Sequence, residues 1–243
     1  MLKNIISLSG GKDSTAMLLM MLEKKEPIHS IIFFDTGWEF PEMLEHIKKL
    51  EKYINMKIIK IYPAKSFDYL LLEQPVKKRG TDTIHRIGYG WPSPLRRWCT
   101  GQKLSTIKKY YNAQNNFISC IGFATDEIKR IPIKPKKYIE RYPLIEYGIS
   151  EKEALQYCYE KGFDWGGLYE VFNRVSCFCC PMKRINDYRK MRVKYPELWE
   201  KMLAMDKYLG VKRGFRGLKT VQDLDKRFAC EDRQMDLFTN KEE

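Results

Sequence analysis

A short glycine turn between two apolar stretches, close to the start of the chain, most constrains its fold. Residues 5–8 are mostly apolar, residues 9–15 read Ser-Gly-Gly-Lys-Asp-Ser-Thr, and residues 16–22 are apolar again. This order predicts a strand, a tight turn and a helix. The two glycines can adopt backbone angles closed to other residues and let a ligand approach, and free N–H groups at a helix start attract anions. The turn is therefore predicted to bind phosphate or pyrophosphate.

The side chains of this turn support the same interpretation. Lys12 adds a mobile positive charge, and Asp13 would repel phosphate unless it holds Mg²⁺, a cation that carboxylates and phosphates bind together. The turn is not a Walker A loop, because Ile6 stands where that motif needs its first glycine and an aspartate follows the lysine. The alternative is an ordinary turn with a helix-capping residue. The predicted nucleotide-binding residues are Ser9, Gly10, Gly11, Lys12, Asp13, Ser14 and Thr15, of which Lys12 and Asp13 are also predicted to be catalytic.

Length and composition are those of a globular protein with an anionic partner. The 243 residues can form one large domain, or a domain with an appendage, and can bury a sizeable core. The net charge of +13 favours a nucleotide or a nucleic acid as partner, and a lysine-rich solvated surface explains it equally well. No apolar run is long enough to span a bilayer, and the N-terminus lacks the pattern of a signal peptide. A cytoplasmic protein without a membrane partner is expected.

Strand-like and helix-like stretches alternate through the first part of the chain. Ser150 and Glu153 form a capping box that starts a helix. The alternation predicts an α/β fold with a doubly wound parallel sheet. After about residue 165 the strand pattern fades, so we expect a nucleotide-binding domain at residues 1–165 and a smaller, mainly helical, cysteine-containing region at residues 166–243. Other expected strands lie at residues 30–34, 57–61 and 117–123, and other helices at residues 41–54, 67–72, 105–111 and 198–209.

Asp35 and Thr36 directly follow the second expected strand. In open α/β sheets, ligands bind in the crevice at the carboxyl ends of the strands. Both residues are therefore predicted to face the same nucleotide as the glycine turn. A turn that uses Asp and Gly for its backbone geometry alone is the alternative.

Two basic stretches are candidate contacts for an anionic partner. Residues 77–98 contain Gly, Pro, Arg and aromatic residues without a period, which predicts a long functional loop. His85 within it is a candidate phosphate contact. Residues 183–195 interleave lysines and arginines with two tyrosines, and four more cations follow at residues 212–219, a pattern that suits nucleic-acid backbones, with a solvated helical face as the alternative.

The order of these motifs resembles the phosphoadenylyl-sulfate (PAPS) reductase family of the adenine nucleotide alpha-hydrolase-like superfamily, which also includes N-type ATP pyrophosphatases and tRNA sulfurtransferases. The resemblance implies that the chain binds ATP or PAPS as a nucleotide substrate. It also implies that Gly122, Asp126, Glu127 and Arg130 contact the nucleotide or the substrate anion. The matching segments follow one another between residues 4 and 181, namely residues 9–15, 33–42, 95–104, 121–130, 142–145 and 167–180.

Seven cysteines, an odd and clustered set, favour metal, cluster or redox roles over a disulfide framework. Cys177 and Cys180 have the Cys-x-x-Cys spacing of common metal or cluster ligands. Cys99 follows two arginines, which are expected to lower its pKa and favour the thiolate. Cys120 and Cys158 are expected to pack in the core.

The family resemblance implies a ligand set for an iron–sulfur cluster. Family members with clusters have cysteine pairs at the positions of Trp98-Cys99 and Cys177/Cys180, and Trp98 replaces one member of the first pair. We take Cys230 as the fourth ligand of a [4Fe–4S] cluster, with Cys179 as the alternative. Structural zinc on the same thiolates and free buried thiols are the two other interpretations.

The chain departs from the family near its C-terminus. PAPS reductases carry a catalytic cysteine in a Glu-Cys-Gly-(Leu or Ile)-His signature, whereas the last cysteine here, Cys230, stands in Ala-Cys-Glu-Asp. Cys230 is the candidate for that catalytic thiol. The departure weakens the expectation of classical sulfate reduction.

Together these patterns predict an enzyme of sulfur metabolism that adenylates an acceptor and passes sulfur to it, as in tRNA thiolation or DNA phosphorothioation. One alternative is a reductase that releases sulfite from PAPS or adenylyl sulfate. Another is a non-catalytic module that binds nucleotide or nucleic acid. The predicted partners are an adenine nucleotide, a nucleic-acid acceptor, a sulfur-donor protein or a thioredoxin-like reductant, and a second copy of the chain.

Overall fold

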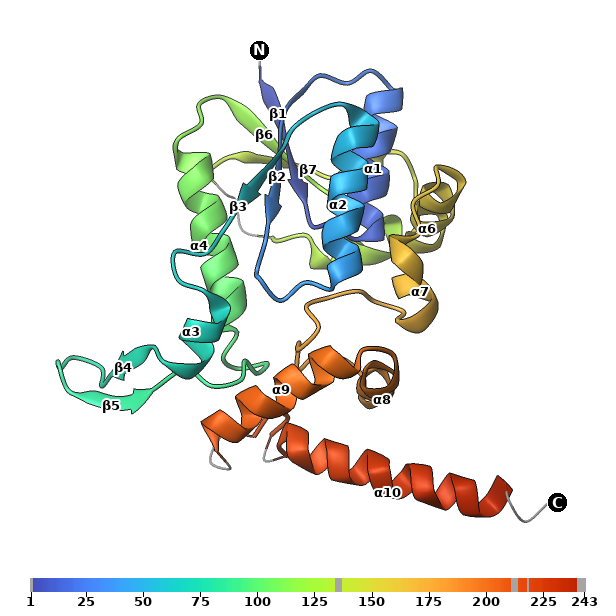
Figure 1. Cartoon of the computed structure of the whole chain (residues 1–243). Helices are drawn as coiled ribbons and strands as arrows, with labels where there is room; N and C mark the ends of the chain where they lie inside the picture. Colours follow the sequence, from blue (N-terminus) through green and yellow to red (C-terminus); the bar gives the residue numbers. More distant parts are fainter. Residues whose placement is uncertain (1, 134–136, 211–213, 218, 240–243) are drawn as a thin grey trace. The chain divides into compact units, whose positions relative to one another are not determined.

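The computed structural model describes residues 2–133, 137–210, 214–217 and 219–239. The chain divides into two compact units (Figure 1). Unit 1 comprises Met1–Ala64 and Lys103–Ser176, and unit 2 comprises Lys65–Gln102 and Cys177–Glu243. This partition differs from the expected division at residue 165, because residues 65–102 belong to the same compact unit as the C-terminal helices. Each unit is described by itself below.

Unit 1 contains a five-stranded sheet in which all paired strands run parallel. The strand order is β3-β2-β1-β6-β7. The central strands are buried on both faces, which explains their continuous apolar runs. The predicted doubly wound α/β fold is confirmed. The strands are β1 (Lys3–Leu8), β2 (Ile28–Phe34), β3 (Ile58–Ile61), β6 (Phe117–Ile121) and β7 (Ile139–Arg141).

Helices cover both faces of this sheet. Neighbouring residues of β2 point to opposite faces. Ile32 packs with Tyr111 of α4, whereas Phe33 lies near Gly10 on the side of α2. Figure 1 accordingly shows α1 and α2 over one face and α4 over the other. The helical elements are α1 (Lys12–Glu23), α2 (Pro41–Ile54), α4 (Trp98–Asn112), η1 (Thr125–Arg130), α5 (Pro143–Glu146), α6 (Glu151–Glu160), η2 (Trp165–Gly167) and α7 (Leu168–Val171).

The local sequence signals explain several helix ends. Pro41 occupies the first turn of α2, where its missing N–H costs nothing. The predicted capping box is confirmed, since the Ser150 side chain accepts from the Glu153 amide and Glu153 returns to the Ser150 amide. The helix expected at residues 105–111 begins earlier, at Trp98. Gly101, a poor helix former, lies inside the added turn and hides its helical character in the sequence.

Unit 2 is mainly helical and carries one small antiparallel hairpin. The hairpin corrects the expectation of a long loop at residues 77–98. Its strands are only three and four residues long and largely exposed, so they leave no apolar period in the sequence. The elements of unit 2 are α3 (Phe67–Leu72), β4 (Pro75–Lys77), β5 (Ile84–Ile87), α8 (Ile185–Lys194), α9 (Pro196–Leu209) and α10 (Val221–Thr239).

A buried carboxylate joins three segments of unit 2. Asp206 on α9 is 3% exposed, and its oxygens accept hydrogen bonds from the Trp91 indole at 3.0 Å and the Val221 amide at 2.9 Å. The amide of Gln222 donates to the same carboxylate at 3.3 Å. These bonds satisfy the free amides at the start of α10 and fix Trp91 against α9. No helix in the described ranges is both long and apolar enough to cross a membrane.

Candidate functional site

The predicted phosphate-binding turn lies where the strand order of the sheet reverses. β1 is followed along the chain by β2 on one side, while β6 pairs with β1 on the other side. Residues that follow β1, β2 and β6 therefore meet at one edge of the sheet. Ligands of doubly wound folds bind at this switch point. The fold thus brings the turn, the segment after β2 and the segment after β6 to one edge.

Gly10 cannot be replaced without distorting the turn. Its φ of +81° lies in the left-handed region, and a Cβ here would sit 2.5 Å from the Met43 sulfur. Gly11 has φ −74° and precedes the first residue of α1. The hydroxyls of Ser9 and Ser14 lie 2.9 Å apart, and the Ser9 amide donates to Ser14 Oγ at 3.1 Å. The expected strand–turn–helix geometry is present, with its backbone in a defined conformation.

Two aromatic side chains from the η2–α7 segment hold the backbone of the turn. The Trp165 indole donates to the Gly10 carbonyl at 2.7 Å, and the Lys12 amide donates to the Tyr169 hydroxyl at 2.8 Å. The two rings pack edge to face with centroids 4.8 Å apart. The Cys158 thiol also donates to the Lys12 carbonyl at 3.5 Å. The sequence reasoning missed Trp165, although a buried tryptophan needs an acceptor for its N–H.

A buried histidine supports α1 directly behind the turn. His46 of α2 is 4% exposed, and its Nε2 lies 3.0 Å from the Thr15 hydroxyl. Its ring stacks on Trp165 with centroids 4.5 Å apart. Burial and the nearby Lys49 cation lower the pKa of His46 to about 3. The imidazole is therefore neutral at physiological pH. Thr15 is fully buried, and its hydroxyl is the hydrogen-bond partner of His46.

Lys12 lies between two carboxylates. Its ammonium donates to Asp13 at 2.9 Å and also to Glu151, the first residue of α6. Burial opposes the charge, but the hydrogen bonds with Glu151 and Asp13 outweigh it and raise the pKa of Lys12. Burial also raises the pKa of Asp13, and its pairing with Lys12 offsets this only in part. Glu151 is a charged member of the site that the sequence reasoning did not single out.

The segment after β6 packs against the start of α1. A Cβ on Gly122 would lie 2.8 Å from the Ser14 backbone, so glycine is required for this approach. Asp126 accepts a hydrogen bond from the Glu151 amide at 3.2 Å. Glu127 pairs with Arg130, and its charge acts on Asp13. The residues predicted from the third motif are therefore gathered beside the turn.

Arg130 and the pair that follows β2 have additional contacts. The Arg130 guanidinium lies 4.5 Å above the Phe123 ring centroid. Asp35 accepts from the Gly37 amide at 2.8 Å, which is the backbone role that the alternative interpretation assigns to it. The Thr36 hydroxyl donates to Glu39 at 2.8 Å. Burial raises the pKa of Glu39. Asp35 and Thr36 thus build the turn, and a direct nucleotide contact from either one stays a prediction.

The donor set beside Lys12 suits Mg²⁺ in company with phosphates. Mg²⁺ in proteins is commonly held by one or two carboxylates, with substrate phosphates and water completing its shell. Asp13 with Glu127 or Glu151 supplies such a pair. Within the part of the chain that the structure describes, no three His, Cys, Asp or Glu residues converge as a metal site. A nucleotide would therefore have to complete the coordination.

The cysteines predicted to hold a cluster all belong to unit 2. Cys177 and Cys180 form a tight turn in which the Cys180 amide donates to the Cys177 carbonyl at 3.1 Å. Cys230 is exposed on α10, and Cys179 is fully buried. Among the described residues, these thiols do not converge as a site for iron or zinc. The predicted ligand set is thus not brought together among the described residues, and the cluster stays a prediction from the sequence.

Two predictions about individual thiols have opposite outcomes. The pKa of Cys99 was expected to be lowered by its arginine neighbours. Burial instead raises the pKa of Cys99, and the nearby Cys180 adds to the effect, because Arg96 and Arg97 extend into solvent. Cys120 and Cys158 are fully buried, which confirms their predicted place in the core. Burial raises the pKa of both thiols to about 12.

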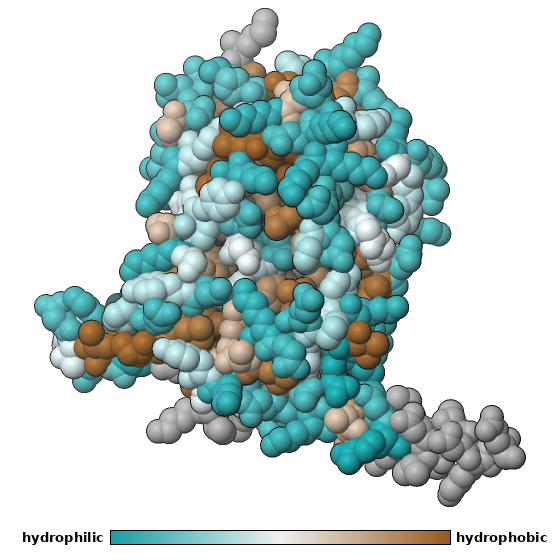
Figure 2. Space-filling model, viewed as in Figure 1, coloured by the Kyte–Doolittle hydropathy of each residue, from teal (hydrophilic) through white to brown (hydrophobic). Residues whose placement is uncertain are grey.

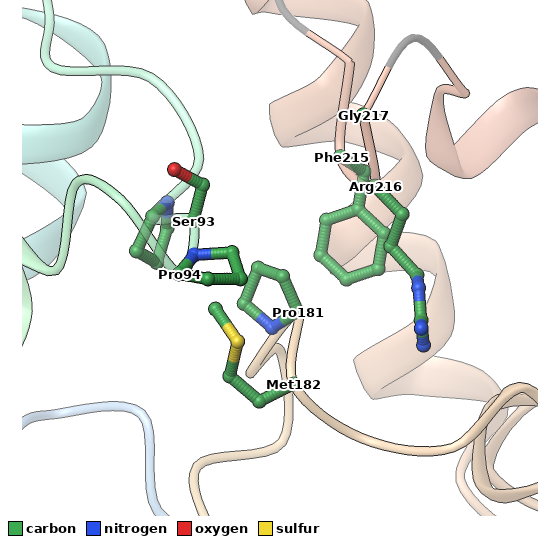
Figure 3. Close-up of a pocket in the computed structure, with 8 residues that line it drawn as sticks. Ser93, Pro94, Pro181, Met182, Phe215, Arg216 and Gly217 are labelled. Atoms are coloured by element: carbon green, nitrogen blue, oxygen red, sulfur yellow. The ribbon is translucent and has the colours of Figure 1, made fainter.

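Unit 2 also contains an open groove of about 440 Å³ (Figure 3). Its walls are largely proline, methionine and phenylalanine side chains. The Arg216 guanidinium, its cationic group, donates to the Lys183 carbonyl. Such a lining favours contact with a flat apolar ring over phosphate binding. The residues of the groove are Pro92, Ser93, Pro94, Pro181, Met182, Phe215, Arg216 and Gly217.

The basic stretch at residues 183–219 is largely engaged in contacts within unit 2. Arg189 and Arg192 of α8 pair with acidic residues of α10, with Asp232 at 2.7 and 2.8 Å. Lys183 is buried. Lys212 and Arg213 lie outside the described residues. In the described part of this stretch, the basic side chains therefore serve the packing of unit 2 or face solvent, and a nucleic-acid groove explains them less well.

Replacing Tyr169 by phenylalanine tests the support of the turn. We expect Tyr169→Phe to weaken binding of adenine nucleotide about fivefold, since a net hydrogen bond contributes about 1 kcal/mol. Calorimetric titration with ATP measures the change. Tyr159→Phe, in a tyrosine that is 37% exposed on α6, is the matched control and should bind like the wild type. Equal affinity of both variants would contradict the supporting role.

The neutral state of His46 predicts a pH dependence of stability. Its pKa is about 3 in the folded chain and about 6.5 in an unfolded one, so the unfolded state binds the proton first. This contribution to stability is complete above pH ~6.5 and falls by up to about 1.4 kcal/mol per pH unit as the pH decreases toward 3. Urea unfolding at several pH values should show that His46→Gln loses this slope. The variant His29→Gln, in an exposed histidine, should retain it.

Known proteins share sequence or fold with this chain. A protein of Methanocaldococcus jannaschii described as uncharacterized is 29% identical over 81% of this chain, and the chain spans 40% of that protein's length. An adenosine 5'-phosphosulfate reductase of Bacillus mycoides is 24% identical over 68% of both chains. The crystal structure of a PAPS reductase from Candida auris, in complex with phosphate, shares the fold, with a TM-score of 0.51 and 15% identity over 73% of this chain and 83% of that one.

The sequence also matches a protein family defined by its conserved domain. The match is to the phosphoadenosine phosphosulfate reductase domain and spans residues 3–183. This range includes the glycine turn, the segments after β2 and β6, and the aromatic residues that hold the turn. The chain therefore belongs to the phosphoadenosine phosphosulfate reductase domain family.

Proposed function

We propose that the chain is an enzyme that uses Mg²⁺ and ATP to adenylate an acceptor oxygen, which a sulfur nucleophile then attacks. The proposed acceptor is a nucleic acid, as in tRNA thiolation or DNA phosphorothioation. Family membership supports a nucleotide substrate at the glycine turn. The finer assignment, to ATP and to an acceptor, depends on the charges that surround Lys12.

The observation that carries the proposal is the pairing of Lys12 with carboxylates. Asp13, Glu127 and Glu151 place more negative than positive charge around Lys12 and Arg130. A phosphosulfate anion alone would be repelled by this arrangement. A nucleotide that arrives with Mg²⁺ neutralises the carboxylates and frees Lys12 for the phosphates. This balance favours Mg²⁺–ATP over PAPS as the nucleotide.

The residues of the turn have defined tasks in the proposed first step. The acceptor oxygen forms a bond to the α-phosphorus, the bond from that phosphorus to its bridging oxygen breaks, and pyrophosphate leaves while the acceptor proton passes to water. Lys12 and the amides at the start of α1 stabilise the charge that builds on the leaving pyrophosphate. Asp13 would hold Mg²⁺, which supplies electrostatic stabilisation of the same charge.

The second step transfers sulfur to the activated acceptor. A sulfur nucleophile forms a bond to the acceptor carbon or phosphorus, and AMP leaves with the oxygen. We assign no role in this step to a metal cluster, because the predicted ligands Cys99, Cys177, Cys180 and Cys230 do not converge among the described residues. The sulfur source is proposed to be a separate donor protein.

The alternative function is the reduction of adenylyl sulfate or PAPS to sulfite. The similarity to the Bacillus mycoides adenosine 5'-phosphosulfate reductase favours it. The reaction needs a cysteine thiolate that takes the sulfite group from the nucleotide. It also needs a thioredoxin-like protein that reduces the resulting cysteine–sulfite adduct and so releases sulfite. Cys230 is exposed and remains the proposed thiol. Cys99 is less suited, because burial raises its pKa.

A comparison of two reactions separates these functions. We expect the protein, purified without oxygen, to release pyrophosphate from ATP when a nucleic-acid acceptor is present, and to release no sulfite from PAPS with thioredoxin. Lys12→Ala should slow pyrophosphate release about 100-fold or more, as the loss of a group that stabilises transition-state charge does. Lys48→Ala, an exposed lysine paired with Glu45, should leave the rate unchanged. Sulfite release that requires Cys230 would support the alternative, and tight nucleotide binding without turnover would overturn both.

Metal analysis tests the cysteine set directly. Because no three metal-ligating side chains converge among the described residues, we expect iron and zinc contents far below one atom per chain after anaerobic purification. Stoichiometric iron with absorbance near 400 nm, lost in Cys180→Ala, would instead establish the cluster predicted from the sequence. Stoichiometric zinc in a colourless protein would support the structural alternative. Cys120→Ala, in a core thiol, is the control that should leave metal content unchanged.

A further inference from the structure

The hairpin of unit 2 is a basic projection. We call residues 75–87, with β4, β5 and the turn between them, the hairpin arm. Residues 77–97 contain six basic residues and a single acidic one, Asp82. Asp82 pairs with Lys77 at 2.6 Å, and this exposed pair is screened by solvent. Lys78 and Arg79 at the tip are exposed, and among the described residues neither forms an ion pair.

The hairpin arm has a rigid base, although an isolated two-stranded hairpin is only marginally stable. The amides of Tyr89 and Gly90 donate to the carbonyls of Leu70 and Leu71 at 2.8 and 3.0 Å. Gly88 has φ +69°, and a Cβ on it would lie 2.3 Å from the Leu71 oxygen. The carbonyls at the end of α3 are thus satisfied by the chain that leaves β5. These contacts fix the direction of the hairpin arm relative to α3.

One face of the hairpin arm is apolar and uncovered. Ile87 pairs with Pro75, and Ile84 pairs with Lys77, with a register shift that leaves His85 as an extra residue. Residues that pair across strands share a face, so the bulge places both isoleucines on the same side. Ile84 is 52% exposed and Ile87 is 50% exposed. Figure 2 shows this apolar band on the arm, between hydrophilic residues.

His85 stabilises the bulge and presents a further polar group. Its Nδ1 lies 2.9 Å from the Val76 carbonyl. A carbonyl oxygen can only accept, so Nδ1 carries the hydrogen. The exposed ring therefore adds to the polar edge beside the isoleucines. The hairpin arm combines unpaired cations at its tip with an apolar face along its strands.

We propose that the hairpin arm binds duplex DNA as a two-stranded ribbon in the major groove. Lys78 and Arg79 would contact backbone phosphates, because the closely spaced negative charges of duplex DNA attract unpaired cations. A two-stranded ribbon fits the B-DNA major groove, which is about 12 Å wide, and Ile84 and Ile87 suit the thymine methyl groups displayed there. This inference rests on the nucleic-acid acceptor of the proposed function and locates its contact on residues 75–87.

Binding of labelled duplexes, followed by fluorescence anisotropy without nucleotide, tests the inference. We expect Lys78→Ala/Arg79→Ala to bind a short duplex DNA at least about tenfold more weakly, at ~0.15 M salt, than the wild type does. The slope of log K against log salt should become less steep by about 1.8, because two phosphate contacts are lost. Ile84→Ser/Ile87→Ser should weaken binding with the salt slope unchanged, because it removes apolar contacts only.

A matched pair of cations provides the control. Lys108 and Lys109 are adjacent, exposed and on α4, and Lys108→Ala/Lys109→Ala changes the net charge by the same amount. This variant should bind like the wild type. Equal losses in the two double variants would overturn the inference and leave only general attraction by the net charge of +13. Tighter binding of duplex RNA than of duplex DNA would also overturn it, since the A-form major groove is too deep and narrow for the ribbon.

A separate measurement distinguishes this inference from the proposed function. Pyrophosphate release from ATP depends on Lys12, whereas duplex binding depends on Lys78 and Arg79. If the wild-type protein binds duplex DNA but does not turn over ATP, the result would support duplex binding by the hairpin arm and overturn the proposed adenylation step. The opposite result is also informative. If ATP turnover with a nucleic acid is the same in Lys78→Ala/Arg79→Ala as in the wild type at all salt concentrations, duplex binding by the hairpin arm is overturned and the adenylation step is left intact.

Discussion

The hydrogen bonds of Trp165 and Tyr169 to the backbone of the glycine turn are the interactions on which the candidate site depends. A turn with a glycine at positive φ has little intrinsic preference for one conformation, because glycine loses more conformational entropy than any other residue when it is fixed. The Gly10 carbonyl and the Lys12 amide each have an aromatic partner, at 2.7 and 2.8 Å. These partners come from a segment more than 150 residues away in sequence. The loop is thus preorganised by tertiary structure.

The same support fixes the charges of the site. Because the backbone amide of Lys12 is fixed, its side-chain ammonium can reach only nearby groups. Asp13 and Glu151 lie within that reach. Glu151 is placed in turn by the capping box of α6, and Asp126 accepts from its amide. Charges in a partly buried cradle interact more strongly than in water and cannot be screened by salt as easily. An anionic substrate must therefore compete with the two carboxylates for Lys12 unless a cation accompanies it.

The sequence was sufficient for the frame of the fold and for the glycine turn. α2 was predicted at the bounds it has, Pro41–Ile54, because its apolar period and its first-turn proline are local signals. Trp165 and Glu151 were not identified as parts of the site, since their roles depend on contacts across the fold that no local pattern encodes. The acidity of Cys99 was predicted from its arginine neighbours in sequence. Burial has the opposite effect on its pKa and is the larger one.

The hairpin arm shows why a functional surface can lack a sequence period. A strand is recognised when one face is buried and the other is polar, and that alternation requires a covered face. Ile84 and Ile87 are three residues apart and share a face only because of the bulge at His85. Both side chains are about half exposed. Leaving apolar surface in water costs free energy, which a partner that covers it would recover. The feature that hid the hairpin from sequence reasoning, an uncovered apolar face beside unpaired cations, is also the feature that a bound duplex would explain.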